Sequence, residues 1–152
     1  MFMCAPGYAK SILNRLNGNI HVVLGNHDKT TLRLTKTHNV KKFASVSETK
    51  YITIEGQKIF MCHYALRTWR ASYHGSWALF GHSHGRMPPF GKSFDVGVDC
   101  WNYYPISFEQ VQRKMDKLEL LPFGDEDMPA SEADRLKQIA LEHKKNDKSL
   151  GT

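Results

Sequence analysis

Short apolar runs that each end in a loop with glycine and histidine constrain this chain more than any other feature of its sequence. Residues 19–24 form a β-branched run that stops at Gly25, residues 58–62 stop at His63, and residues 77–80 stop at Gly81. Runs of this kind predict buried strands. Because loops at the carboxyl ends of sheet strands carry the site in α/β proteins, the sequence predicts an α/β fold with its site at these strand ends.

The rest of the chain supplies helices, further strands and a turn. Ser107 and Gln110 match a capping box, which opens a helix that we expect to end near residue 120. Residues 29–38 are polar and residues 67–75 are expected to form a loop. The hydrophobic periodicity also predicts a helix over residues 7–16, strands over 43–46, 51–54 and 93–98, a hairpin turn at 55–57, and a tail helix over 132–144.

The length and composition fit one globular domain followed by a short tail. The 152 residues are 41% hydrophobic and 24% charged, and no apolar run approaches the ~20 residues of a membrane span. Prolines and a glycine in residues 122–129 indicate a linker, so we expect a domain over 1–123 and a linker with a helical tail over 124–152. Three widely spaced cysteines predict neither a disulfide framework nor a zinc ribbon, and a cytoplasmic location is expected.

The formal net charge of +6 leaves a basic nucleic-acid-binding domain as one alternative. Such modules carry a basic helix or basic residues interleaved with aromatic ones, and neither pattern occurs in this sequence. Nucleic acid is therefore expected only as a substrate, and this alternative ranks below an enzyme.

Three of the loops that follow strands carry side chains that bind metals. These side chains are Asn26 with His27, then His63, then His82 with His84. Imidazole suits Zn, Mn, Fe or Ni, and an amide oxygen completes a mixed shell. Strand-like geometry in the His-x-His spacing would place both imidazoles on one side, and flanking glycines allow the tight turns that bring ligands together. A lone histidine such as His63 is more often a core residue, so the prediction of a metal site depends on all three loops together.

These motifs resemble, in order and spacing, the downstream motifs of the calcineurin-like metallophosphoesterases. The carriers of the resemblance are Gly25-Asn26-His27-Asp28, a strand that ends in His63, and Gly81-His82-Ser83-His84. Residues 63–69, 74–77 and 93–99 look like the small bacterial and phage branch of that family, and the resemblance extends over about residues 1–110. It implies an αββα sandwich, with mixed sheets flanked by helices, and the hydrolysis of phosphomonoesters or phosphodiesters.

The resemblance also implies roles for single residues. Asn26, His63 and His82 match ligands of the second metal of a two-metal site, and His84 matches a ligand of the first. In the family site two divalent ions of Mn, Ni, Fe or Zn, about 3.5–4 Å apart, hold a bridging hydroxide that attacks the phosphate ester. His27 would be the catalytic histidine that either stabilises the transition state or protonates the leaving oxygen, and Asp28 the acidic residue that orients it.

Two further side chains, Arg67 and His74, lie between the metal-type loops. Arg67 could hold a phosphate through its guanidinium fork, and His74 could assist it. Packing within a loop is an equal alternative for both residues.

The sequence departs from the family pattern at its beginning. Asp-x-His and Gly-Asp-x-x-Asp motifs open that pattern, whereas residues 1–27 contain no Asp or Glu. We therefore expect that the first β-α-β portion of the sandwich is missing and that this chain binds at most one metal ion, because no carboxylate bridges two. Asp95 or Asp99 could substitute, although an ordinary structural role is favoured for both. The activity of this chain alone is doubtful.

An inactive remnant, or a fragment completed by another chain, is the main alternative to an active enzyme. The strand over residues 19–24 would lack a neighbour on one side and expose apolar side chains, which favours marginal stability and self-association. Among the remaining residues, the expected core aromatics are Trp69, Trp77, Phe80 and Trp101, and Cys62 and Cys100 are expected to be buried and inert.

Overall fold

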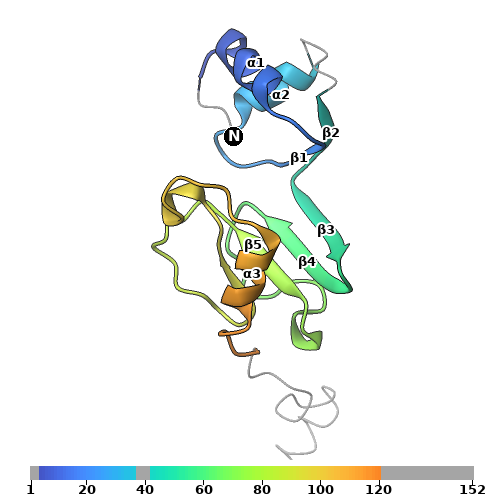
Figure 1. Cartoon of the computed structure of the whole chain (residues 1–152), viewed down its shortest axis with the longest axis vertical. Coiled ribbons are helices and arrows are strands. Elements are labelled where there is room, and N and C mark those ends of the chain that lie inside the picture. Colours follow the sequence, from blue (N-terminus) through green and yellow to red (C-terminus); the bar gives the residue numbers. More distant parts are fainter. Residues whose placement is uncertain (1–3, 37–41, 121–152) are drawn as a thin grey trace, which may run out of the picture. The chain divides into compact units, whose positions relative to one another are not determined.

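The computed structural model describes residues 4–36 and 42–120. The chain divides into two units, residues 1–120 and 121–152, and the predicted boundary after residue 123, the linker and the tail helix fall outside the described residues. The elements along the chain (Figure 1) are α1 (Pro6–Arg15), β1 (Ile20–Val23), α2 (Lys29–Lys36), β2 (Phe43–Ser47), β3 (Thr49–Ile54), β4 (Gln57–Cys62), η1 (Ser72–His74), β5 (Trp77–Phe80), β6 (Ser93–Asp95), η2 (Val98–Cys100) and α3 (Phe108–Met115).

The strands form two sheets. One contains β1 and β2 in parallel, with Val22 opposite Val46. The other has the order β3-β4-β5-β6, in which β3 and β4 are antiparallel whereas β4, β5 and β6 run parallel. The predicted α/β class, with mixed strand directions and flanking helices, is confirmed. The carboxyl ends of β4 and β5 consequently lie next to each other at one edge of the larger sheet.

A tight turn joins β3 to β4, as the sequence predicts. Glu55 and Gly56 both have positive φ angles, of 50° and 82°, and the ladder closes with Ile54 opposite Gln57. Two left-handed residues in succession are typical of a type I′ turn, whose twist matches that of paired antiparallel strands. Glycine occupies the second position at no steric cost.

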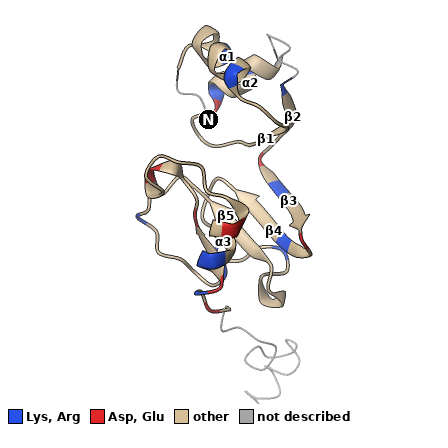
Figure 2. Cartoon of the chain, in the orientation of Figure 1, with Lys and Arg blue, Asp and Glu red and all other residues tan. Residues whose placement is uncertain are grey.

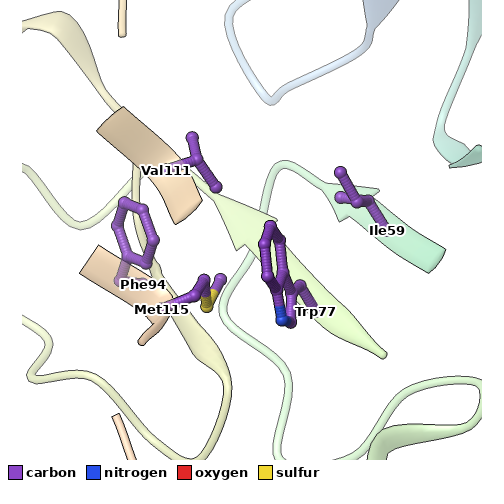
Figure 3. Close-up of a cluster of buried hydrophobic side chains, with 5 residues drawn as sticks. All are labelled: Ile59, Trp77, Phe94, Val111 and Met115. Carbon is purple, nitrogen blue, oxygen red and sulfur yellow. The ribbon is translucent and has the colours of Figure 1, made fainter. Parts of the chain in front are cut away.

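The core of the larger sheet lies between its strands and α3 (Figure 3). Ile59, Trp77 and Phe94 come from β4, β5 and β6, and they pack with Val111 and Met115 of the helix. All five are less than a tenth exposed. The helix therefore covers one face of the sheet and leaves the loops at its edge to form a site.

The capping box predicted at the start of α3 is confirmed. The Ser107 hydroxyl accepts the Gln110 N–H at 3.3 Å, and the Gln110 side-chain oxygen accepts the Ser107 N–H at 2.8 Å. The helix ends at Met115, several residues before the predicted end. Lys117 and Leu118 donate to carbonyls only three residues back, so the last turn tightens instead of continuing.

A smaller core lies between α1 and α2. Ala9 and Leu13 of α1 and Leu34 of α2 are fully buried there. The helix over residues 7–16 is confirmed to within a residue at each end, whereas α2 was not predicted. Its segment has only two apolar residues, Leu32 and Leu34, and it buries Thr31 and Leu34 while its other side faces solvent. A single buried leucine is too weak a periodic signal to predict a helix.

The strand predicted over residues 93–98 ends early, at Asp95. The Asp95 carboxylate accepts the Gly97 N–H at 2.8 Å, and the chain then enters η2. A side chain that bonds the backbone two residues on forms an Asx-type turn, which competes with strand extension. The alternating pattern of residues 93–98 did not reveal this competition.

The sequence predicts that β1 lacks a neighbour on one side and exposes apolar side chains, and only the first part of this prediction agrees with the structure. Within residues 4–36 and 42–120, β1 pairs with β2 alone. Its apolar side chains are not exposed, however, because Val22 is 4% exposed and Ile20 and Val23 are half-buried. The predicted exposed apolar run is therefore wrong, although the backbone of this edge is unpaired in the described part of the chain.

Aromatic side chains largely lie where they were expected, but one cysteine does not. Trp69, Trp77 and Phe80 are buried, and Trp101 is half-buried with its indole N–H bonded to the Asp95 carbonyl at 3.1 Å. Cys100 is exposed, so the prediction that it is buried is wrong, and Cys62 is half-buried.

Basic residues are distributed along the described part of the chain. Figure 2 shows Lys and Arg spread over several helices and strands of the described residues and not gathered on one element. Among these residues no helix has the length and apolar character needed to cross a bilayer.

Candidate metal centre

Three loops that follow strands bring an amide and two imidazoles together. Asn26 lies in the turn after β1, His63 directly follows β4, and His82 is two residues beyond β5. Because β4 and β5 are parallel neighbours, His63 and His82 leave the sheet at the same edge. The Gly81 N–H donates to the His63 carbonyl at 3.1 Å and ties the two loops to each other. The convergence predicted from the three motifs is present in the structure.

The three side chains form a close triangle, which we call the Asn-His-His triad (Asn26, His63 and His82). His63 Nε2 lies 2.8 Å from Asn26 Oδ1 and 3.1 Å from His82 Nδ1. His82 Nδ1 lies 3.2 Å from Asn26 Oδ1. Each of the three atoms is therefore within hydrogen-bonding distance of the other two.

Hydrogen bonds cannot satisfy this triangle by themselves. A bond on every side would need at least one atom that both donates and accepts. A ring nitrogen is either protonated or bears a lone pair, and each amide atom only donates or only accepts. At most two of the three contacts can be hydrogen bonds, and this holds for either orientation of the Asn26 amide and for any tautomer of the histidines. In the remaining contact two donors or two acceptors face each other.

A cation fits the triad better than protons do. Ligands about 2.1 Å from a metal and at right angles to each other are about 3.0 Å apart, close to the three separations in the triad. Two nitrogens and one amide oxygen form a donor set that suits a Zn-like, Mn-like, Fe-like or Ni-like ion. No group of three His, Cys, Asp or Glu gathers within the described residues, so the amide is what completes the triad.

The electrostatics of the triad favour neutral imidazole. Burial lowers the pKa of His63 below its ordinary value, and the neighbouring His82 lowers it further, while Asp28 opposes the shift. Neutral imidazole is the form that ligates metals. His63 is thus kept in its metal-binding form.

A glycine allows the Asn26 turn to approach His63. A Cβ atom at residue 25 would lie 2.6 Å from both Nδ1 and Cε1 of the His63 ring, far inside contact distance. Only glycine therefore fits at this position. The sequence predicts that glycines beside the metal-type residues let the loops come close together, and this is confirmed for Gly25 and His63.

Asp28 stabilises the same turn. It is 4% exposed, and its carboxylate accepts the Gly25 N–H and the Thr31 hydroxyl, each at 2.7 Å. Burial would raise its pKa, but hydrogen bonds, including those from Thr31 and Gly25, hold the pKa below its ordinary value. Asp28 is the residue just before α2, and its carboxylate ties the Gly25 turn to Thr31 in the first turn of that helix. A role in orienting His27, which is exposed, stays a prediction.

Asp95 holds the loop that carries His82. It is 7% exposed, and one carboxylate oxygen accepts the Ser83 hydroxyl at 2.6 Å and the Gly85 N–H at 3.1 Å. Its other oxygen is used by Gly97. Asp95 therefore positions the His-x-His loop instead of serving as a free ligand, a role that could not be assigned from the sequence.

The His-x-His loop does not have the strand-like geometry that was expected. His82 and His84 both have positive φ angles, 65° and 51°. His82 joins the triad, whereas His84 is 70% exposed and pairs with Asp99 through Nδ1. The pKa of Asp99 is lowered first by this hydrogen bond from His84. Assignment of His84 to a first metal stays a prediction.

Arg67 and His74 lie in different surroundings. Arg67 is exposed, with its guanidinium 5.8 Å from the centre of the Phe90 ring. His74 is also exposed, and its neighbour Gly75 accepts a hydrogen bond from Gln57, the first residue of β4. His74 thus lies at the amino end of β4, whereas the triad lies at the carboxyl end. The structure therefore does not bring His74 to the triad, and a contact between His74 and phosphate stays a prediction.

Tyr64 is a neighbour of the triad that the sequence did not indicate. Its ring makes edge contacts with His63 and His82, with centroids 5.0 and 4.8 Å apart. Tyr64 is 47% exposed, so its ring contacts the two histidines of the triad while part of it faces solvent. An aromatic residue next to a ligand in the sequence was the only signal for it.

No protein-family model matches the chain. The uncharacterized protein MJ1445 of Methanocaldococcus jannaschii is 28% identical over 116 residues, which are 72% of this chain and 57% of that protein. The chain thus spans little more than half the length of this curated relative. The crystal structure of the protein of unknown function AQ665 from Aquifex aeolicus matches with 24% identity and a TM-score of 0.47, over 70% of this chain and 64% of that one. Neither name states an activity.

Proposed function

We propose that the chain carries the metal-binding half of a phosphoesterase site similar to that of the calcineurin-like metallophosphoesterases. The Asn-His-His triad is the observation that supports this proposal. Three motifs far apart in the sequence place their donor atoms within 3.2 Å of one another, and protons alone cannot satisfy the contacts. The proposed fold around the complete site is the αββα sandwich.

The proposed reaction is hydrolysis of a phosphate ester. A divalent ion held by the triad would neutralise phosphate oxygens and make water a better nucleophile. His27, exposed and next to Asn26 in the sequence, is the proposed proton donor to the leaving oxygen. Arg67, exposed and always charged, is the proposed second contact for the phosphate.

One ion per chain is proposed, not two. Residues 1–27 provide no carboxylate, Asp95 is engaged by its own loop, and Asp99 is paired with His84. Two divalent ions held by neutral ligands would repel each other without a bridging anion. Full activity would therefore need carboxylates from outside the described residues.

Metal content of purified variants tests this proposal. The full chain, loaded with Mn²⁺ and dialysed, is expected to retain about one ion, and His63→Ala and His82→Ala should each lose it. His74→Ala is the matched control, because it removes an exposed histidine at the other end of β4. Equal Mn²⁺ in all three variants would contradict the proposal, as would aryl phosphodiester hydrolysis that EDTA leaves unchanged.

We propose, as a second candidate function, a fragment that another chain completes. Its support is the edge of β1, which within the described residues pairs only with β2. A strand with one unpaired edge offers backbone donors and acceptors to an incoming strand. Sedimentation equilibrium over a range of concentrations is expected to show association. A monomer at every concentration would exclude self-association.

A further inference from the structure

A cavity of about 340 Å³ adjoins the segments that carry the triad histidines, and of its lining residues the proposed reaction uses only Arg67. We call it the arm pocket: its walls are residues 65–67, the arm of residues 87–90, and the side chains of Phe80 and Ser93. Residues 65–67 begin two positions after His63, and Phe80 comes two positions before His82. Two walls of the pocket are therefore continuations of the segments that carry the triad histidines.

Phe80 lies in the walls of two cavities. It lines the arm pocket, and it also belongs to the wall of a smaller cavity of about 220 Å³, whose other walls include His63 and Gly81. Phe80 is 4% exposed and lies on β5, so the sheet fixes its position. The arm pocket and the triad are therefore linked along the chain through the end of β5 and the loop that follows it.

The arm is held in place before any ligand arrives. The Ser93 hydroxyl donates to the Phe90 carbonyl at 2.7 Å, and the Phe90 N–H donates to the Ser93 carbonyl at 3.3 Å. Pro88 and Pro89 fix two successive φ angles between Met87 and Phe90. A wall that is already ordered costs little conformational entropy when a ligand binds.

The chemistry of the lining selects one class of group. Apart from Arg67 and Ser93 the lining side chains are apolar, and the Ser93 hydroxyl is used by Phe90. A sugar or a nucleobase would leave its polar atoms without side-chain partners there, which is costly. An aryl group of one or two rings, or an alkyl group of similar size, matches both the apolar lining and the volume of the pocket.

Arg67 gives the pocket a charged rim. Its guanidinium lies 5.8 Å from the centre of the Phe90 ring and is exposed, so it can turn toward an anion. An aryl phosphate presents the matching pattern, with negative charge at one end and an apolar ring at the other.

We propose that the arm pocket binds the aryl or apolar leaving group of the phosphate ester, with Arg67 at its rim contacting the phosphate. This proposal rests on the proposed function. Hydrolysis would break the bond between phosphorus and the leaving oxygen, water would supply the new bond to phosphorus, and a proton would end on the leaving oxygen. The released phenol or alcohol would occupy the arm pocket.

Two probes that cannot be hydrolysed separate the ring from the charge. Calorimetry with the Mn²⁺-loaded full chain should show phenylphosphonate binding roughly 10- to 100-fold more tightly than methylphosphonate, as burial of a ring predicts. Phe90→Ser and Met87→Ser should each reduce this ratio toward one, and both residues are exposed enough to be replaced without loss of the fold. Arg67→Gln should weaken both probes alike.

A matched control and a metal measurement distinguish the possible failures. Tyr103→Ser removes an aromatic ring that is 79% exposed and outside the lining, and it should leave the ratio unchanged. Equal affinities for the two probes in a chain that does bind Mn²⁺ would overturn the arm pocket while the metal centre stands. Loss of the phenylphosphonate preference in Tyr103→Ser would also overturn it. Failure to bind Mn²⁺ at all would instead refute the proposed function.

Discussion

Gly25 lies against the imidazole of His63 so closely that a Cβ atom at residue 25 would fall 2.6 Å from two of its ring atoms. Neither the backbone turn nor the ring can yield without opening the triad, because His63 Nε2 is already 2.8 Å from Asn26 Oδ1. We therefore expect Gly25→Ala to displace His63 and to lower Mn²⁺ affinity roughly 10- to 100-fold, as substitutions that misorient a ligand do.

Calorimetric titration of Mn²⁺ measures this effect, and Gly7→Ala is the matched control. A Cβ at residue 7 meets nothing within 4 Å, so the same substitution there should leave affinity unchanged. Wild-type affinity in Gly25→Ala would show that the ring is free to move, and that the triad is not the metal site.

Asp95→Asn should weaken metal binding through His82 without contacting the metal. One carboxylate oxygen accepts from Ser83 and Gly85 and the other accepts from Gly97, whereas an amide has only one oxygen that can accept. The substitution therefore leaves at least one N–H donor without its acceptor, which costs about 1–3 kcal/mol where the donor is buried. The measurement is the Mn²⁺ affinity together with the urea midpoint. Ser83→Ala removes one of these bonds and should give a smaller loss of both. A purely structural role would lower the midpoint and leave the affinity of the folded protein intact.

The positions of the strands and of the triad could be predicted because they depend on local patterns. Short apolar runs mark β1, β4 and β5, and the loops that follow the parallel neighbours β4 and β5 leave the sheet at the same edge. The capping box at Ser107 was equally visible, since it is a four-residue signal. Tertiary burial decides the rest: α2 buries one leucine, and no local pattern predicts a helix from that.

The His-x-His loop shows where local reasoning about the site fails. A period of two predicts that His82 and His84 point the same way, but this holds only for extended backbone. The left-handed conformations of both residues are stabilised by Asp95, a residue more than ten positions away in the sequence. Because that hydrogen bonding is non-local, the pairing of His84 with Asp99 could not be derived from the motifs.

Asp28→Asn should destabilise the fold as well as the site. The carboxylate accepts two hydrogen bonds of 2.7 Å, one buried and one partly buried. An amide could keep the Gly25 bond through its oxygen and reverse the Thr31 bond, but it lacks the negative charge that strengthens both, so we expect a loss of about 1–2 kcal/mol in the free energy of unfolding. Urea denaturation measures the loss. Glu48→Gln is the control, since Glu48 is exposed. A change below about 0.5 kcal/mol in Asp28→Asn, the range of ordinary surface substitutions, would contradict the assigned role of Asp28 in stabilising this turn.

Ser107→Ala should weaken the attachment of α3 to the sheet. Loss of an N-cap hydroxyl costs about 1 kcal/mol, and this helix supplies Val111 and Met115 to the core. Thermal unfolding should show a lower midpoint in Ser107→Ala and a nearly normal one in Ser107→Asp, whose carboxylate can accept the same N–H. If both variants melt alike, the capping hydrogen bond is not what stabilises the start of α3.

Metal binding should stabilise the chain, because the triad joins a loop of the two-stranded sheet to two loops of the four-stranded sheet. Asn26 follows β1, and the two histidines follow β4 and β5. An ion that binds only the folded chain adds about 2.7 kcal/mol at a free concentration 100-fold above its dissociation constant. For a domain of this size the melting temperature should rise by several degrees with Mn²⁺ and return with EDTA. His63→Ala should show no such rise, whereas His74→Ala should respond as the wild type does. A rise of the same size in His63→Ala would place the stabilising ion elsewhere on the chain.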